Sequence, residues 1–60
     1  MTDLQRHTLI TQAIDIESRG VDVMIQLKEL GSPTLVEAMV LIVRNARAIA
    51  AVLRDDGEPR

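Results

Sequence analysis

The segment LKELGSPT at residues 27–34 decides the fold, because one helical pattern ends in it and another begins. Gly31 suits the left-handed conformation that commonly follows the last residue of a helix. Ser32 suits the N-cap of a new helix, and Pro33 suits the first helical position because it lacks the N–H that would be unpaired there. The segment therefore predicts a turn at residues 31–33 between two antiparallel helices.

Toward the N-terminus, the helical pattern runs back from this turn to Thr2. Thr2 and Gln5 have the spacing of a capping box, in which each side chain bonds the backbone N–H of the other residue. The pattern predicts a first helix over about residues 2–30. Gly20 interrupts this helix at a cost of about 1 kcal/mol relative to alanine. It indicates either a tolerated cost with a slight kink or a point where two helices approach closely.

Toward the C-terminus, a second helix is expected over about residues 34–55, followed by a frayed tail at residues 56–60. Thr34 and Glu37 form a second candidate capping box for its start, and the sequence does not choose between the two starts. No segment alternates apolar and polar residues as a strand would. Because the chain has room for one domain only, residues 1–60 are predicted to form a single all-α helical hairpin.

Apolar residues recur at heptad spacing in both predicted helices, which is typical of coiled-coil packing. Two alternating rows on each helix are expected to face each other inside the hairpin. They start at Leu9 and Ala13 on the first helix and at Leu35 and Met39 on the second. Second rows, which include Ile14 and Val43, widen the apolar surface beyond about 200° of the helix circumference, which one partner helix cannot cover. We therefore expect hairpins to assemble into a four-helix bundle dimer or a larger homo-oligomer. The expected interface residues are Leu9, Ile10, Ile14, Ile16, Val21, Val23, Ile25, Leu27, Val36, Met39, Val40, Ile42, Val43, Ile49 and Leu53.

The composition excludes several kinds of site. There is no cysteine, so disulfides, thiolate metal sites and a cysteine nucleophile are absent, and a single histidine excludes a His-rich metal site. The lack of Phe, Tyr and Trp removes base-stacking platforms, and the net charge of −2 argues against general nucleic-acid binding. No catalytic motif is present, so we expect neither an enzyme nor a bound cofactor. No apolar run approaches the roughly 20 residues of a membrane span and no signal peptide is recognisable, which predicts a cytoplasmic protein without a membrane partner.

Three arginines form the most informative polar feature of the second helix. Arg44, Arg47 and Arg54 line one side of a helix that is otherwise largely apolar. They either extend to the edge of a bundle and form salt bridges there, or converge from several copies on an anion, since a guanidinium can donate two parallel hydrogen bonds to phosphate. In the second interpretation Asn45 and Thr11 would read the base or ribose of a nucleotide-like ligand.

The heptad register, the run LKEL at residues 27–30 and the acidic run at residues 55–58 resemble the Rop (repressor of primer) family of plasmid copy-number regulators. The resemblance implies two hairpins in an antiparallel four-helix bundle that binds RNA loops through its first helices. On the corresponding face, Arg19 and Gln26 would contact RNA. Asp15 stands where that family has a key aromatic residue, and an aspartate there would repel phosphate, so the resemblance concerns the fold.

Residues 35–39, together with Asn45-Ala46 and Ile49-Ala50, are similar to phage-encoded helical sponges that sequester cyclic-nucleotide signals in anti-CBASS immunity. This similarity implies immune evasion by ligand sequestration. We therefore expect a small phage- or plasmid-encoded regulatory protein that acts as a homo-oligomer and sequesters a host protein or a nucleotide-like ligand. A Rop-like RNA-binding regulator and a purely structural oligomerisation module are the alternatives.

Overall fold

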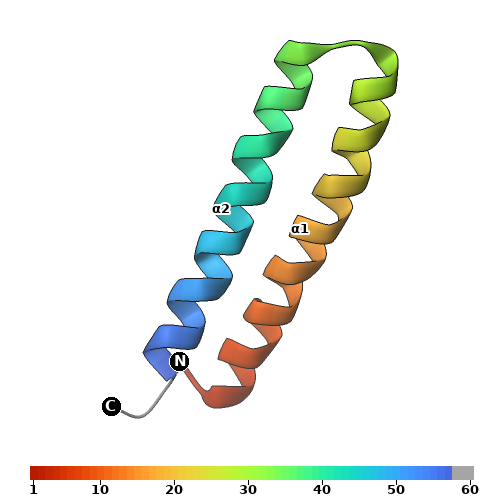
Figure 1. The fold of residues 1–60 in the computed structure, drawn as a ribbon. Helices are drawn as coiled ribbons and strands as arrows, with labels where there is room; N and C mark the ends of the chain where they lie inside the picture. Colours follow the sequence, from red (N-terminus) through yellow and green to blue (C-terminus); the bar gives the residue numbers. More distant parts are fainter. Residues whose placement is uncertain (58–60) are drawn as a thin grey trace.

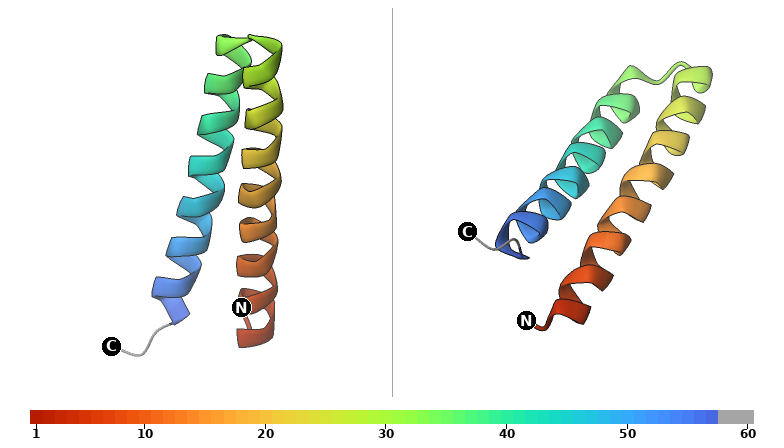
Figure 2. Two further views of the ribbon diagram at one scale, coloured as in Figure 1. Left: turned by 45° about the vertical axis from the view of Figure 1, so that its right-hand side comes forward. Right: turned by 60° about the horizontal axis from the view of Figure 1, so that its bottom comes forward.

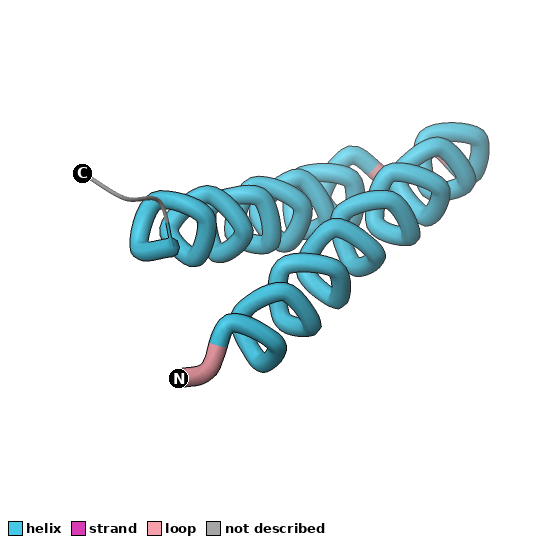
Figure 3. Tube along the Cα trace, turned by 90° about the horizontal axis from the view of Figure 1, so that it is seen from below, coloured by secondary structure: helices cyan, strands magenta, loops and turns pink. Residues whose placement is uncertain are grey.

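The computed structural model describes residues 1–57, which form two α-helices joined in an antiparallel hairpin (Figure 1). α1 spans Asp3–Leu30 and α2 spans Pro33–Gly57. The hairpin measures 45 × 17 × 13 Å. The helices lie side by side and separate toward the end that holds the start of α1 and the end of α2, as Figure 2 and Figure 3 show. The all-α helical hairpin predicted from the sequence is confirmed.

α2 extends slightly beyond its expected end. The tail was expected from residue 56, but residues 56 and 57 are helical. Glycine at residue 57 permits this, because it adopts the right-handed helical conformation as well as the left-handed one that ends a helix. The rest of the expected tail, residues 58–60, lies outside the described residues.

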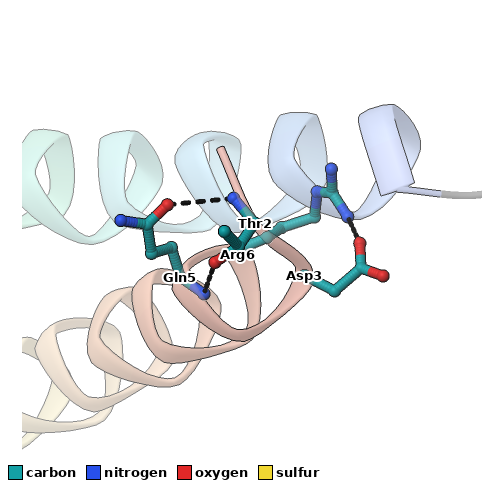
Figure 4. Close-up of polar contacts among 4 residues, drawn as sticks. All are labelled: Thr2, Asp3, Gln5 and Arg6. Carbon is teal, nitrogen blue, oxygen red and sulfur yellow. Dashed lines mark hydrogen bonds and ion pairs between the residues drawn. The ribbon is translucent and has the colours of Figure 1, made fainter.

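The start of α1 is held by the predicted capping box (Figure 4). The Gln5 N–H donates to Thr2 Oγ1 at 3.1 Å, and the Thr2 N–H donates to Gln5 Oε1 at 2.9 Å. One turn further along α1 from Asp3, Arg6 donates through Nη1 to Oδ1 of Asp3 at 2.7 Å. Asp3 also lies in the first turn, where a negative charge interacts favourably with the helix dipole. These contacts fix the first residue of the helix.

The end of α1 forms a Schellman motif around Gly31. Gly31 has φ 75° and ψ 32°, in the left-handed region. Its N–H donates to the Lys28 carbonyl at 3.1 Å, and the Ser32 N–H donates to the Leu27 carbonyl at 3.3 Å. Two carbonyls that the helix end would leave unpaired are satisfied in this way.

α2 begins at Pro33, so the first of the two candidate starts is the one the chain uses. The Ser32 carbonyl accepts from the Val36 N–H at 3.1 Å, which closes the first turn of the helix. Thr34 therefore lies inside α2 and does not cap it. A connection of two residues between the helices makes the hairpin tight.

We expect Gly31→Ala to lower the free energy of unfolding by about 1 kcal/mol, because a Cβ disfavours the left-handed conformation. No heavy atom lies within 4 Å of the position that this Cβ would take, so backbone strain alone accounts for the cost. Chemical denaturation measures the loss. Gly31→Asn should cost less, because asparagine tolerates this conformation better than alanine does; equal stability of Gly31→Ala and the parent would contradict the assignment.

The contact between the helices is built from small side chains. The buried apolar residues are Ala13, Val43, Ala46 and Ala50, and Gly20 is buried with them. Larger apolar side chains border this seam and are half-buried. They are Ile10, Val21, Met24, Leu27, Val36, Met39, Val40 and Leu53. No large side chain is fully buried in the described part of the chain, so a single hairpin has little hydrophobic core.

Gly20 marks a close approach of the two helices. A Cβ placed on Gly20 would lie 2.7 Å from Cγ2 of Val43, closer than carbon atoms pack in proteins. Of the two interpretations that the sequence allows, close approach is therefore confirmed. Glycine has a low helix propensity, but its lack of a side chain lets α1 and α2 pack tightly at this position.

The expected seam between the helices is correct in part, because Ala13, Gly20 and Ala46 were expected in it and are buried. The rows that start at Leu9 and Leu35 were expected to pack inside the hairpin, yet Ile16 and Ile42 in these rows are 51% and 47% exposed. Val43, which was expected to face another copy, is buried instead. The helices turn so that their smallest residues meet, because this arrangement permits the close approach at Gly20. The larger residues of the heptad rows are left on the surface.

Candidate binding faces of the hairpin

The hairpin has two broad faces, one on each side of the seam between α1 and α2. Successive helical residues are rotated by about 100°, so the two neighbours of a buried residue point toward opposite faces. Ala46 is buried, Asn45 lines a groove on one side, and Arg47 consequently lies on the other side. We call these sides the groove face, defined by the groove residues given below, and the arginine face, which carries Arg44, Arg47 and Arg54.

The groove face is an apolar surface without charge. Its groove has a volume of about 480 Å³ between the two helices. The lining residues are Leu9, Gln12, Ala13, Ile16, Ile42, Asn45, Ala46, Ile49 and Leu53. Heptad spacing extends the same rows toward the turn through the exposed Val23 and Leu35. Such a surface suits contact with another apolar surface, with the two amides as its polar groups.

The arginine face contains an ion pair between the helices. Arg47 donates through Nη2 and Nε to Oε1 of Glu17, at 3.0 and 3.2 Å. The Arg47 side chain remains 69% exposed, so the pair contributes less than about 1 kcal/mol. Arg44 and Arg54 are exposed and form no ion pair within residues 1–57. Within a single hairpin, Arg47 therefore forms a salt bridge, as one of the two interpretations of the sequence expects.

The five residues predicted to bind an anion do not all lie together in one chain. The three arginines share the arginine face, whereas Asn45 lines the groove. Thr11 is exposed on α1, where its hydroxyl donates to the His7 carbonyl at 3.0 Å. A site that used all five residues would therefore draw them from more than one copy of the chain.

The residues of the alternative RNA site lie on the exposed side of α1. Arg19 and Gln26 are seven residues apart and share one stripe of the helix. Arg19 Nε lies 3.1 Å from Oδ2 of Asp15, so a carboxylate partly neutralises the cation. Phosphate would have to compete with this aspartate for Arg19.

Two residues of these faces were not identified from the sequence. Glu17 stands between Ile10 and Met24 in a heptad row, and a charge in such a row is a signal for a partner across the seam. Gln12 precedes the buried Ala13 and so reaches the groove. Neither signal identifies the partner without knowledge of how the helices are rotated.

A metal-binding cluster and a membrane-spanning helix are both missing from residues 1–57. No group of three or more His, Asp or Glu residues there is arranged to hold a metal ion. Neither helix in this range combines the length and apolar character that crossing a bilayer requires.

No protein-family model, curated protein or solved structure matches this chain. The helical hairpin therefore rests on the structure alone. The functions implied by resemblance to the Rop family or to cyclic-nucleotide sponges stay predictions.

Proposed function

We propose that this chain is a non-enzymatic binding protein that acts as a homo-oligomer and sequesters a host protein or a phosphate-bearing, nucleotide-like ligand. The observation that carries the proposal is the distribution of apolar side chains. Among the described residues, the buried apolar side chains are Ala13, Val43, Ala46 and Ala50, while thirteen large hydrophobic side chains are exposed. Exposure on this scale is typical of a surface that another molecule covers.

The size of the chain supports self-association. A chain of 60 residues buries only about 60% of the surface that it exposes when unfolded, less than a larger domain does. Small chains are often stabilised by disulfides, a metal or oligomerisation. Cysteine is absent from the sequence, and no metal-ligand group is present within residues 1–57. Association of several hairpins would bury the exposed apolar rows and supply the missing core.

The arginine face supports binding of an anionic ligand. It carries three guanidinium groups on one side of α2, and Arg47 alone has an acidic partner on this face within residues 1–57. In a symmetric oligomer each copy would present the same set of cations, which raises the local positive potential. A planar guanidinium fits a phosphate through two hydrogen bonds, so a phosphate-bearing ligand suits this face.

Native mass spectrometry of protein purified from cells without refolding tests the proposal. We expect a multimer that carries additional mass, which is released on denaturation. The double variant Arg44→Gln/Arg54→Gln should keep the multimer and lose the additional mass. Arg19→Gln is the matched control because it removes an exposed arginine outside the arginine face, and it should retain the ligand.

Other outcomes of this experiment would contradict parts of the proposal. A monomeric parent protein would contradict homo-oligomerisation. A multimer without ligand would contradict nucleotide sequestration and leave a protein partner, to be sought by pull-down from the native host. RNA that is lost in Arg19→Gln, with a steep dependence of affinity on salt, would favour the RNA-binding alternative.

A further inference from the structure

We infer that the groove face is the docking surface for a second copy of this chain, paired about a two-fold axis that passes near Asn45 and leaves the arginine face open. The inference rests on the homo-oligomer proposed above and specifies which surface forms it. Three properties of the groove face support it: its charge, its area and the placement of its amides.

The charge distribution of α2 separates the two faces. Arg44 lies two residues after Ile42, and Arg47 lies two residues before Ile49. Two residues correspond to about 200° around a helix, so both arginines point away from the groove that the isoleucines line. Two copies can therefore meet through their groove faces without removing Arg44 or Arg47 from water, which would be costly if either were left unpaired. An acidic or basic partner would find no complementary charge in the groove.

The area of the groove face matches a stable dimer. The outline of the hairpin on this side, 45 Å long and 17 Å wide, covers about 800 Å², comparable to the accessible surface of about 800 Å² that each partner buries in a standard stable interface. Apolar side chains are available along this length, from Leu9 near the open end to Leu35 near the turn. A second hairpin has the same length and width and could cover the whole face.

The two amides of the groove indicate a symmetric partner. Asn45 lies midway along α2, which spans Pro33–Gly57. In a two-fold interface a residue near the axis faces its own copy. An amide has both a donor and an acceptor, so Asn45 can pair with Asn45 of the partner subunit or with Gln12 of the partner subunit. An apolar interface with one buried asparagine pair has a defined register and oligomeric state.

The test compares two isoleucines of α1 that are equally exposed but lie on different sides. Ile16 lines the groove and is 51% exposed, whereas Ile25 lies away from the groove and is 50% exposed. Glutamine replaces each in turn, because it adds no charge and favours helix at least as well as isoleucine. Sedimentation equilibrium measures the association, and circular dichroism at the same concentrations measures the helical content.

We expect Ile16→Gln to weaken self-association by about a hundredfold or more, since each of the two copies loses a buried side chain. Ile25→Gln should associate as the parent does. Equal effects of the two variants, or a larger effect of Ile25→Gln, would overturn the groove face while leaving the homo-oligomer intact. A helical, monomeric parent would overturn both.

A variant that does not fold alone is also informative. If Ile16→Gln is unfolded at low concentration, raising its concentration should restore helix, because folding is then coupled to association. Failure to recover helix, combined with recovery in Ile25→Gln, would mean that Ile16 is required within the hairpin and would overturn the inference. The variant Asn45→Cys gives an independent readout, since cysteine is absent from the parent sequence. Under oxidising conditions Asn45→Cys should form a disulfide-linked dimer, and Ile25→Cys should not.

Discussion

Gly20→Leu should abolish the folded hairpin or lower its free energy of unfolding by at least about 3 kcal/mol. A Cβ alone at this position would lie 2.7 Å from Val43 Cγ2, and leucine adds three more carbon atoms. Overpacking of a tight contact costs about 1 to 3 kcal/mol even for small insertions. Val43 cannot easily move aside, because a β-branched residue in a helix has one strongly preferred rotamer. Thermal unfolding followed by circular dichroism measures the loss.

Two variants test whether this loss arises from the contact with Val43. Ser18→Leu is the matched control, because Ser18 lies on the same helix and is exposed, so the change should alter stability by less than about 0.5 kcal/mol. The double variant Gly20→Ala/Val43→Ala should be more stable than Gly20→Ala, because it removes the methyl group that the new Cβ meets. If Gly20→Leu melted at the temperature of Ser18→Leu, the close approach of the helices would be disproved.

Asn45→Leu should strengthen self-association tenfold or more. A leucine contributes about 2 kcal/mol when it is buried, whereas an asparagine at an apolar interface lowers stability and fixes the register. The variant should therefore show a higher melting temperature and a mixture of oligomers in native mass spectra. Sedimentation equilibrium over a range of concentrations gives the association constant.

The control for Asn45→Leu is again Ser18→Leu, because Ser18 is exposed and lies two residues, or about 200°, from the groove residue Ile16 on α1. It should leave the association constant close to that of the parent. Asn45→Asp should weaken association, because two carboxylates would meet near the two-fold axis. A gain in affinity of the same size for Ser18→Leu and Asn45→Leu would show that added hydrophobicity, and not the groove, is responsible.

Local features of the fold could be predicted because they depend on residues close in sequence. The capping box at Thr2 and the left-handed glycine at Gly31 follow from general rules for helix ends. The rotation of the helices could not be predicted in this way. Rows through Leu9 and through Ala13 were both expected at the seam, and heptad spacing does not reveal that only the row through Ala13 is buried there. Close packing at Gly20 decides it, and this packing is a tertiary contact.

The candidate site could likewise be predicted only in part, because some of its features depend on local sequence and others on tertiary contacts. Helix periodicity places Arg44 and Arg47 together on one side of α2, away from the groove, and the structure agrees. The pairing of Arg47 with Glu17 depends on how residues thirty positions apart are aligned across the seam. The composition of the chain and the spacing of its residues do not determine that alignment. The groove itself was not foreseen, although the isoleucines that line it, Ile16, Ile42 and Ile49, were among the expected interface residues.

The small side chains at the seam have a consequence for how the amount of protein controls its activity. Because Ala13, Ala46 and Ala50 contribute little apolar area within one chain, most of the stabilisation of the proposed dimer would come from the contact between its two chains. Stability of such a protein rises with its concentration by mass action. At low expression the chains would be separate and short-lived, and above a threshold they would become paired and persistent. The amount of paired protein would then rise more steeply than in proportion to the number of gene copies.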